Sequence, residues 1–277
     1  DVQDLFVSRR IARLLFKKLR NKNDGRLLGY VNKELTNMSK VIPGSRDTDS
    51  IRDIKSWLRE FEAELAWAHF GIKPSAVHHL RLKFYTADIF PKYPDHKQDV
   101  LPIVKLLEKE KPSIITLAMD PEGSGPDTHF KTLIAISLAV KEYVKNGGNP
   151  DIKIWGYRNV WSRYYPADVS MIVPVSLSSF AVLHNMFSNC FLSQKAASFP
   201  SYEYDGTFSQ LAQKIWVQQH NDLMKVLGRE YFYNDLNPML RRSYGAIYMK
   251  EMTYPEFVRE IEPLYKLLHA KEDLKEI

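Results

Sequence analysis

The chain has 277 residues, of which 44% are hydrophobic and 26% are charged, and its formal net charge is +6 at pH 7. These values are typical of a soluble globular protein with a substantial core, organised as one large domain or two small ones. No apolar run approaches the roughly 20 residues of a membrane-spanning helix, and no secretory leader begins the sequence. Cys190 is the single cysteine, which excludes an internal disulfide and a cysteine-based zinc site. We therefore expect a cytoplasmic protein with no membrane partner, cut from a longer chain because it begins at Asp1 rather than Met.

The excess positive charge is concentrated near the amino terminus, in the stretch RRIARLLFKKLRNK. Such a run could bind nucleic-acid phosphates through counterion release. It could equally be the solvated face of an amphipathic helix, since apolar residues recur at helical spacing through Leu5, Ala12, Leu15, Phe16 and Leu19. We favour the second interpretation because no aromatic or glycine pattern of an RNA-binding module accompanies the run. Residues 1–50 are predicted to form a basic helical amino-terminal segment, without a nucleic-acid partner.

In chain order, the apolar periodicity predicts helices over 3–20 and 26–38, and then a helix that is capped by Asp49 or Ser50 and ends at Gly71. Strands are predicted over 76–84, 113–119, 152–157, 171–175 and 246–252, with Pro174 indicating an edge position. Further helices are predicted over 98–110 and 129–145, from Ser176 or Ser178 to about 192, over 208–227, and from Thr253 to the carboxyl terminus. This alternation predicts an α/β fold, a three-layer Rossmann-like arrangement with a mostly parallel sheet flanked by helices.

One loop stands out, because the apolar strand SIITLAM runs directly into DPEGSGPDTH. In open α/β sheets, ligands bind beyond the carboxyl ends of the strands. The loop contains three acidic residues and places His129 at the start of the next predicted helix. We therefore expect this loop to form one wall of a site.

The order of four segments carries a resemblance: REFEAELAWAHFGI, VHHLRLKFY, KPSIITLAMDPEGSGPDTHFKTL and NCFLSQKAASFPSYEYDGTFSQLAQKIW. Together they resemble the LmbE/PIG-L family of zinc-dependent N-acetylglucosaminyl deacetylases, over roughly residues 50 to 250. More narrowly, they resemble the version fused behind a glucosamine-6-phosphate deaminase-like domain in some bacteria. The resemblance implies a single domain over 1–277 that forms the carboxyl-terminal part of a longer chain and partners an upstream deaminase-like domain or segment.

What the resemblance implies about chemistry is a zinc ion held by two histidines and an aspartate, whose bound water attacks an acetyl group on an amino sugar. Two ligands and the general base lie in a Pro-His-Pro-Asp-Asp segment that is absent from residues 1–277, so the general base is expected upstream of Asp1. His129 matches the third ligand; on residue type alone it could instead be a helix-start histidine with no ligand. With one ligand of three, we expect this chain alone to bind zinc weakly or not at all.

The resemblance also suggests substrate-binding residues, Arg59 in the Arg-x-x-Glu-Ala helix and Asp127 in the loop. Glu62 lies three residues after Arg59, so we expect those two to form an intrahelical ion pair. Pro126 stands where many members carry a histidine that stabilises the oxyanion, and Phe191 stands where many carry a histidine before Ser193-Gln194. The predicted function is a deacetylase-like hydrolase for N-acetylglucosamine-type sugars. The alternative is a catalytically degenerate carbohydrate-binding or scaffolding domain of a glucosamine-6-phosphate deaminase fusion protein.

One further motif, the Pro-Asp-His triplet ending at His96, superficially suits a metal site. It follows a short predicted strand rather than the apolar strand 113–119, so we interpret Asp95 as a helix-entry residue. His78 and His79 are predicted to point to opposite faces of a strand.

Overall fold

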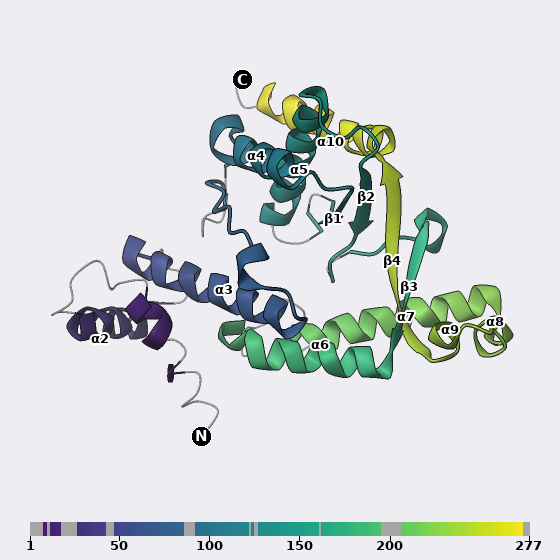
Figure 1. The fold of residues 1–277 in the computed structure, drawn as a ribbon, viewed down its shortest axis with the longest axis horizontal. Coiled ribbons are helices and arrows are strands. Elements are labelled where there is room, and N and C mark those ends of the chain that lie inside the picture. The colour runs from purple at the N-terminus through teal and green to yellow at the C-terminus, as the bar shows by residue number, and fades with distance from the viewer. Residues whose placement is uncertain are drawn as a thin grey trace. The chain divides into compact units, whose positions relative to one another are not determined.

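A computed structural model of the chain describes residues 8–9, 12–17, 27–42, 47–85, 92–121, 123–124, 127–160, 162–194 and 206–273 (Figure 1). The chain divides into two compact units. Unit 1 contains Asp1–His79 and Ser178–Leu211, and unit 2 contains Leu80–Leu177 and Ala212–Ile277. That the whole chain is a single LmbE/PIG-L-like domain stays a prediction.

Unit 2 is built on a four-stranded sheet in the order β1-β2-β4-β3 (Figure 1). The strands are β1 (Ile114–Ala118), β2 (Lys153–Tyr157), β3 (Met171–Ser176) and β4 (Ser243–Thr253). β1 and β2 pair in parallel, whereas β4 runs antiparallel to both of its neighbours, β2 and β3. The sheet is therefore mixed and not mostly parallel as predicted, because the last strand inserts between two earlier ones in the opposite direction. Pro174 lies on β3 at the edge of the sheet, as predicted.

Three helices of unit 2 cover one face of this sheet: α4 (Leu101–Glu110), α5 (Asp127–Lys145) and α10 (Tyr254–Asp273) (Figure 1). Leu117, Ile154 and Met252 of the strands join buried residues of these helices in the main core. The alternate residues of β2 point away from that core. Lys153 and Trp155 bind the Glu251 carboxylate instead, with N–O distances of 3.0 and 2.7 Å. The described residues thus show a helical layer on one face, and the predicted three-layer arrangement is not confirmed.

The second cluster of unit 2 joins β4 to α7 (Phe208–Leu227) and α8 (Arg229–Tyr233), followed by α9 (Pro238–Arg241). α7 has the bounds predicted from its apolar period. Within the cluster, His220 is buried and its Nε2 lies 3.0 Å from Ser243 Oγ. Ser243 Oγ already donates to the Leu240 carbonyl at 2.7 Å, so it accepts a hydrogen bond from His220 Nε2–H. Burial lowers the pKa of His220, and this neutral pair joins α7 to the start of β4.

The segment predicted as a strand over 76–84 is not a strand. It begins with the short helix η1 (Pro74–Ala76) and continues without regular structure. Arg81 has φ = 52°, which breaks the extended conformation. The buried Asp99 carboxylate accepts hydrogen bonds from the backbone N–H groups of Lys83 and Phe84, so these groups are not available to a strand ladder.

Unit 1 is helical in its described residues: α2 (Leu27–Ser39), α3 (Asp49–His69), most of α6 (Leu177–Cys190) and η4 (Leu192–Gln194). α3 begins at Asp49, and its cap is Thr48, one residue before the nearer of the two expected caps; the Thr48 hydroxyl accepts from Ile51 N. Residues 12–17 are also helical. Leu15 is buried against Ile54, which supports the amphipathic interpretation, although Phe16 is 54% exposed. Leu5 and Leu19 lie outside the described residues.

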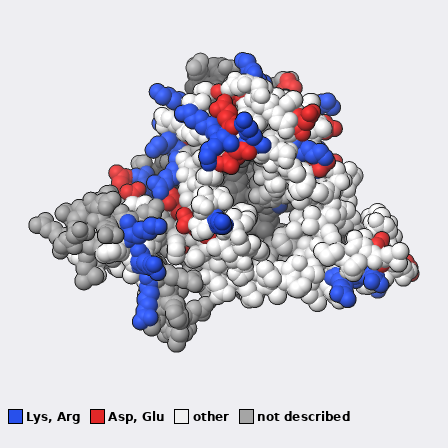
Figure 2. Space-filling model, viewed as in Figure 1, with Lys and Arg blue, Asp and Glu red and all other residues white. Residues whose placement is uncertain are grey.

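Charged side chains of both signs are interspersed over the face formed by α4, α5 and α10, without a continuous basic surface there (Figure 2). In the amino-terminal segment, Arg9, Arg13 and Lys17 are exposed at four-residue spacing. Within the helical segment 12–17, this spacing places Arg13 and Lys17 on one face. Among the described helices, none is both long enough and apolar enough to span a membrane.

Candidate functional site

The candidate site is built on Asp120, two residues beyond the end of β1 and only 2% exposed. Its Oδ1 accepts from the backbone N–H of Asn159 at 2.9 Å, and its Oδ2 accepts from the Asn159 side-chain amide at 2.6 Å. Asn159 follows β2, the strand that pairs in parallel with β1, so the two carboxyl ends meet at one edge of the sheet. The position of the site at this edge is the one expected for α/β proteins.

His129 approaches the same carboxylate from the first turn of α5. Its Nδ1 lies 3.4 Å from Asp120 Oδ2 and 3.4 Å from the Asn159 side-chain nitrogen. The histidine side chain is 31% exposed, and its Nδ1 edge faces the carboxylate and Asn159. The helix start predicted for His129 is confirmed within two residues.

The pKa of Asp120 lies below its ordinary value. Burial alone raises the pKa of this carboxyl, but the nearby His129 ring and the two Asn159 donors together outweigh burial. Asp120 is therefore ionised at neutral pH. The same charge, added to burial, raises the pKa of the adjacent Tyr157.

The ionised carboxylate decides between the two neutral tautomers of His129. In one tautomer Nδ1 carries the proton and faces Asp120; in the other, Nδ1 accepts from Asn159 and the proton sits on Nε2. A hydrogen bond from Nδ1–H to the charged Asp120 carboxylate is stronger than a hydrogen bond from the Asn159 amide to a neutral Nδ1. The geometry therefore favours the first tautomer, which leaves the lone pair of the ring on Nε2.

Arg158 adds a positive charge beside this edge, directly before Asn159. Its guanidinium carbon lies 4.6 Å from the centre of the Tyr164 ring. The Nε and Nη1 atoms of Arg158 are buried without a hydrogen-bond partner, as is the Tyr164 hydroxyl. Burial raises the pKa of Tyr164 to about 12, so its hydroxyl stays a donor. Unpaired buried donors are costly, and this group favours a ligand with an anionic part.

Of the two predicted substrate-binding residues, Asp127 belongs to unit 2 with this group and Arg59 belongs to unit 1. Asp127 lies at the start of α5, but its Oδ2 is 2.5 Å from Lys131 Nζ, one helical turn away. Arg59 is exposed on α3 in unit 1. Their roles in binding stay predictions. Pro126, the other loop position named in the sequence analysis, lies outside the described residues.

Glu62 does not form the expected ion pair with Arg59. It is 2% exposed, and its two carboxylate oxygens accept from Ser193 N at 2.7 Å and Ser193 Oγ at 2.6 Å. The contact joins α3 to η4 within unit 1. Sequence spacing suggested a local partner, whereas the buried carboxylate is satisfied by a residue far along the chain.

The remaining histidines of the sequence analysis have ordinary contacts. His96 is exposed and lies 2.7 Å from Glu142, while Asp95 caps the π-helical turn η2 (His96–Val100), as a helix-entry residue should. His79 Nε2 lies 3.3 Å from Glu64 Oε1. Because residues 77–82 are not a strand, the expected placement of His78 and His79 on opposite faces of a sheet is wrong.

The donor set does not fit zinc by itself. A catalytic zinc ion requires three protein ligands and an open position. In the parts of the chain that the structure describes, no group of three or more His, Cys, Asp and Glu side chains could hold a metal ion. Both oxygens of Asp120 already accept hydrogen bonds, so among the described residues at this edge we regard His129 as the candidate ligand.

Comparison with known proteins gives a distant relation. No family model matches the chain, and no solved structure matches it. Over 138 residues the chain is 33% identical to a Bacteroides thetaiotaomicron protein described as glucosamine-6-phosphate deaminase-like. The match covers 48% of this chain and 20% of that protein. The chain is thus similar to one part of a longer protein, and the finer resemblance to LmbE/PIG-L deacetylases stays a prediction.

Sequence reasoning placed His129 at the site but missed Asn159 and Arg158. Both directly follow β2. Both could have been found from the sequence, because ligands bind beyond the carboxyl ends of parallel strands, and this holds for β2 as it does for β1.

Proposed function

We propose that this chain carries one wall of a hydrolase site for amino-sugar derivatives, deacetylase-like in its chemistry. The observation that supports the proposal is the pairing of a buried, ionised carboxylate with a half-exposed imidazole at the carboxyl edge of the sheet. The relation to a glucosamine-6-phosphate deaminase-like protein supports amino sugars as the substrate class. The positive charge of Arg158, two of whose guanidinium nitrogens are buried without a hydrogen-bond partner, supports a substrate with an anionic group.

In the proposed reaction, His129 Nε2 removes a proton from water as the water oxygen attacks the acetyl carbonyl carbon. Asp120 stabilises the resulting imidazolium through Nδ1. The imidazolium then returns the proton to the amine nitrogen as the C–N bond breaks, releasing acetate and the free amino sugar. No step is assigned to zinc, because the described residues do not supply its ligand set.

A second candidate is a non-catalytic carbohydrate-binding domain. The relation to one part of a longer deaminase-like protein supports it, because that relation indicates an amino-sugar ligand and assigns no reaction to this part. The two candidates differ in turnover rather than in binding, since both retain an amino-sugar ligand.

The test is acetate release from N-acetylglucosamine 6-phosphate by the whole chain, with His129→Ala and His96→Ala compared at equal concentration. His96 is a matched control because it also pairs with a carboxylate, Glu142, but is exposed. We expect His129→Ala to lower the rate about 10²- to 10⁴-fold, the usual contribution of a general base, and His96→Ala to leave it unchanged. Sugar binding without turnover in the unaltered chain would support the second candidate. Equal turnover in both variants would contradict the role of His129.

A further inference from the structure

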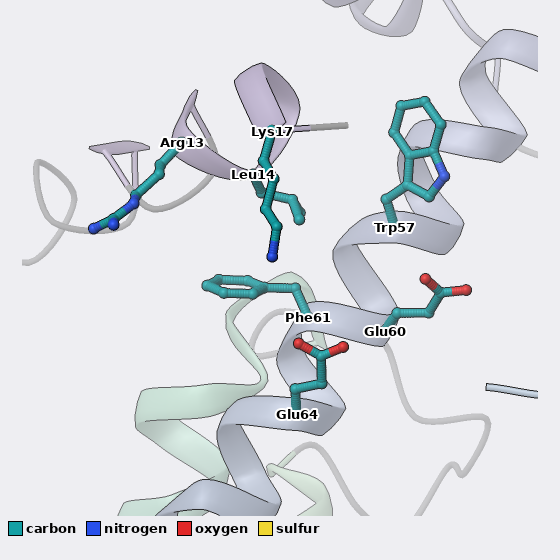
Figure 3. Close-up of a pocket in the computed structure, with 7 residues that line it drawn as sticks. All are labelled: Arg13, Leu14, Lys17, Trp57, Glu60, Phe61 and Glu64. Carbon is teal, nitrogen blue, oxygen red and sulfur yellow. The ribbon is translucent and has the colours of Figure 1, made fainter. Parts of the chain in front are cut away.

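Unit 1 contains a pocket of about 480 Å³, lined by residues of the helical segment 12–17 and of α3 (Figure 3). Its apolar lining consists of Leu14, Trp57 and Phe61. The volume is within the range of small-molecule sites, which are also mainly apolar and aromatic. All lining residues belong to unit 1, and none belongs to the Asp120–His129 site.

The charged residues of the pocket are divided by sign between its two walls. Arg13 and Lys17 come from segment 12–17, and Glu60 and Glu64 come from α3. Four-residue spacing places each pair on one face of its helix. Figure 3 shows Lys17 extending from one wall and Glu64 from the other towards the region of the Phe61 ring, while Arg13 and Glu60 point to the sides.

Within the described part of the chain, no ion pair joins Lys17 to Glu64 across the pocket. Glu64 has one other contact, because its Oε1 lies 3.3 Å from His79 Nε2; its side chain is 37% exposed. The pocket therefore presents the Lys17 ammonium on one wall and a partly exposed carboxylate, Glu64, on the other, with the Phe61 ring between them (Figure 3).

We propose that this pocket binds a small zwitterion whose amine and anionic group stand at opposite ends of a compact ring, as in an amino-sugar phosphate. A ligand of one sign meets a like charge on one of the two walls. A ligand with separated opposite charges places its anion on Lys17 and its amine on Glu64, while the apolar face of its ring lies on Phe61 and Trp57. An α-amino acid carries both charges on one carbon and reaches only one wall.

The test measures binding to the whole chain by calorimetry, with glucosamine 6-phosphate as the probe. Glucose 6-phosphate lacks the amine, glucosamine lacks the phosphate, and phenylalanine is the amino-acid comparison. We expect glucosamine 6-phosphate to bind most tightly, with each charge worth about a two- to fivefold change in affinity at a partly exposed site.

Three variants assign the charges. Lys17→Gln is expected to weaken binding of both phosphates but not of glucosamine, and Glu64→Gln to weaken binding of both amines but not of glucose 6-phosphate. Lys33→Gln is the matched control, an exposed lysine on α2 outside the pocket. Equal affinities for the three sugars, affinity for phenylalanine as high as for glucosamine 6-phosphate, or insensitivity to both variants would overturn the proposal. Loss of glucosamine 6-phosphate binding in His129→Ala would also overturn the proposal, because it would assign the ligand to unit 2. Failure of the hydrolase assay would not affect the binding result.

Discussion

Glu62 in unit 1 and Asp120 in unit 2 are both buried carboxylates, each 2% exposed, yet their partners differ. Both oxygens of Glu62 are bound by the backbone and hydroxyl of Ser193, so the contact is closed. Asp120 is bound by Asn159 and also faces His129, whose side chain is 31% exposed. Burial of a carboxylate therefore does not mark a functional site. Asp120 is distinguished from Glu62 by its contact with a titratable side chain, His129, that is itself partly exposed.

The largest expected effect on stability is at Glu62. Glu62→Ala removes both acceptors of Ser193 and leaves a gap between α3 and η4, so we expect a loss of about 2–3 kcal/mol in the free energy of unfolding. Glu62→Gln keeps the shape, because the Ser193 hydroxyl can reverse and accept from the new amide. Its expected loss is below about 1 kcal/mol. Denaturant melts of the two variants test this, and equal losses would show that the charge rather than the hydrogen bonds matters.

A smaller effect on stability, but a larger one on chemistry, is expected at Asp120. Asp120→Asn replaces an ionised acceptor that has charge-assisted hydrogen bonds, with an expected cost of about 1–2 kcal/mol. It also removes the charge that orients His129. Acetate release should therefore fall in Asp120→Asn and persist in Glu62→Gln. Full activity in Asp120→Asn would show that the Asp120 carboxylate has no more part in the reaction than the Glu62 carboxylate.

The lowered pKa of Asp120 gives the smallest effect, a pH dependence of stability. A carboxyl whose folded-state pKa is depressed contributes stability that is fully present above its unfolded pKa, about 3.9, and lost as pH falls through the folded pKa. The difference in stability between the unaltered chain and Asp120→Asn should therefore shrink below about pH 4. Thermal melts from pH 7 to pH 3 measure it, and a constant difference across that range would argue against the assigned ionisation.

The sequence located much of unit 2 because its signals are local. The apolar runs predicted β1, β2, β3, α5 and α7 to within a few residues. The direction and position of β4 could not be predicted, because pairing between β2 and β3 depends on contacts across the chain. The segment 76–84 alternates like a strand, but its backbone groups are bound by Asp99, 15 residues beyond Phe84.

The candidate site was partly predictable for the same reason. His129 was found because a loop motif precedes a helical pattern. Asn159 completes the site only because β1 and β2 are parallel neighbours, and Glu62 finds Ser193 over a sequence separation that spacing rules do not address.

The role proposed for His129 requires that Asp120 orient its ring with the proton on Nδ1 and the lone pair on Nε2. Long-range ¹H–¹⁵N NMR spectra distinguish the two tautomers of a neutral histidine directly, and His129→Ala identifies the signal. We expect the His129 ring to be protonated on Nδ1 in the unaltered chain. This preference should be lost in Asp120→Asn and kept in Glu62→Gln. A His129 ring protonated on Nε2 in the unaltered chain would contradict the role proposed for His129.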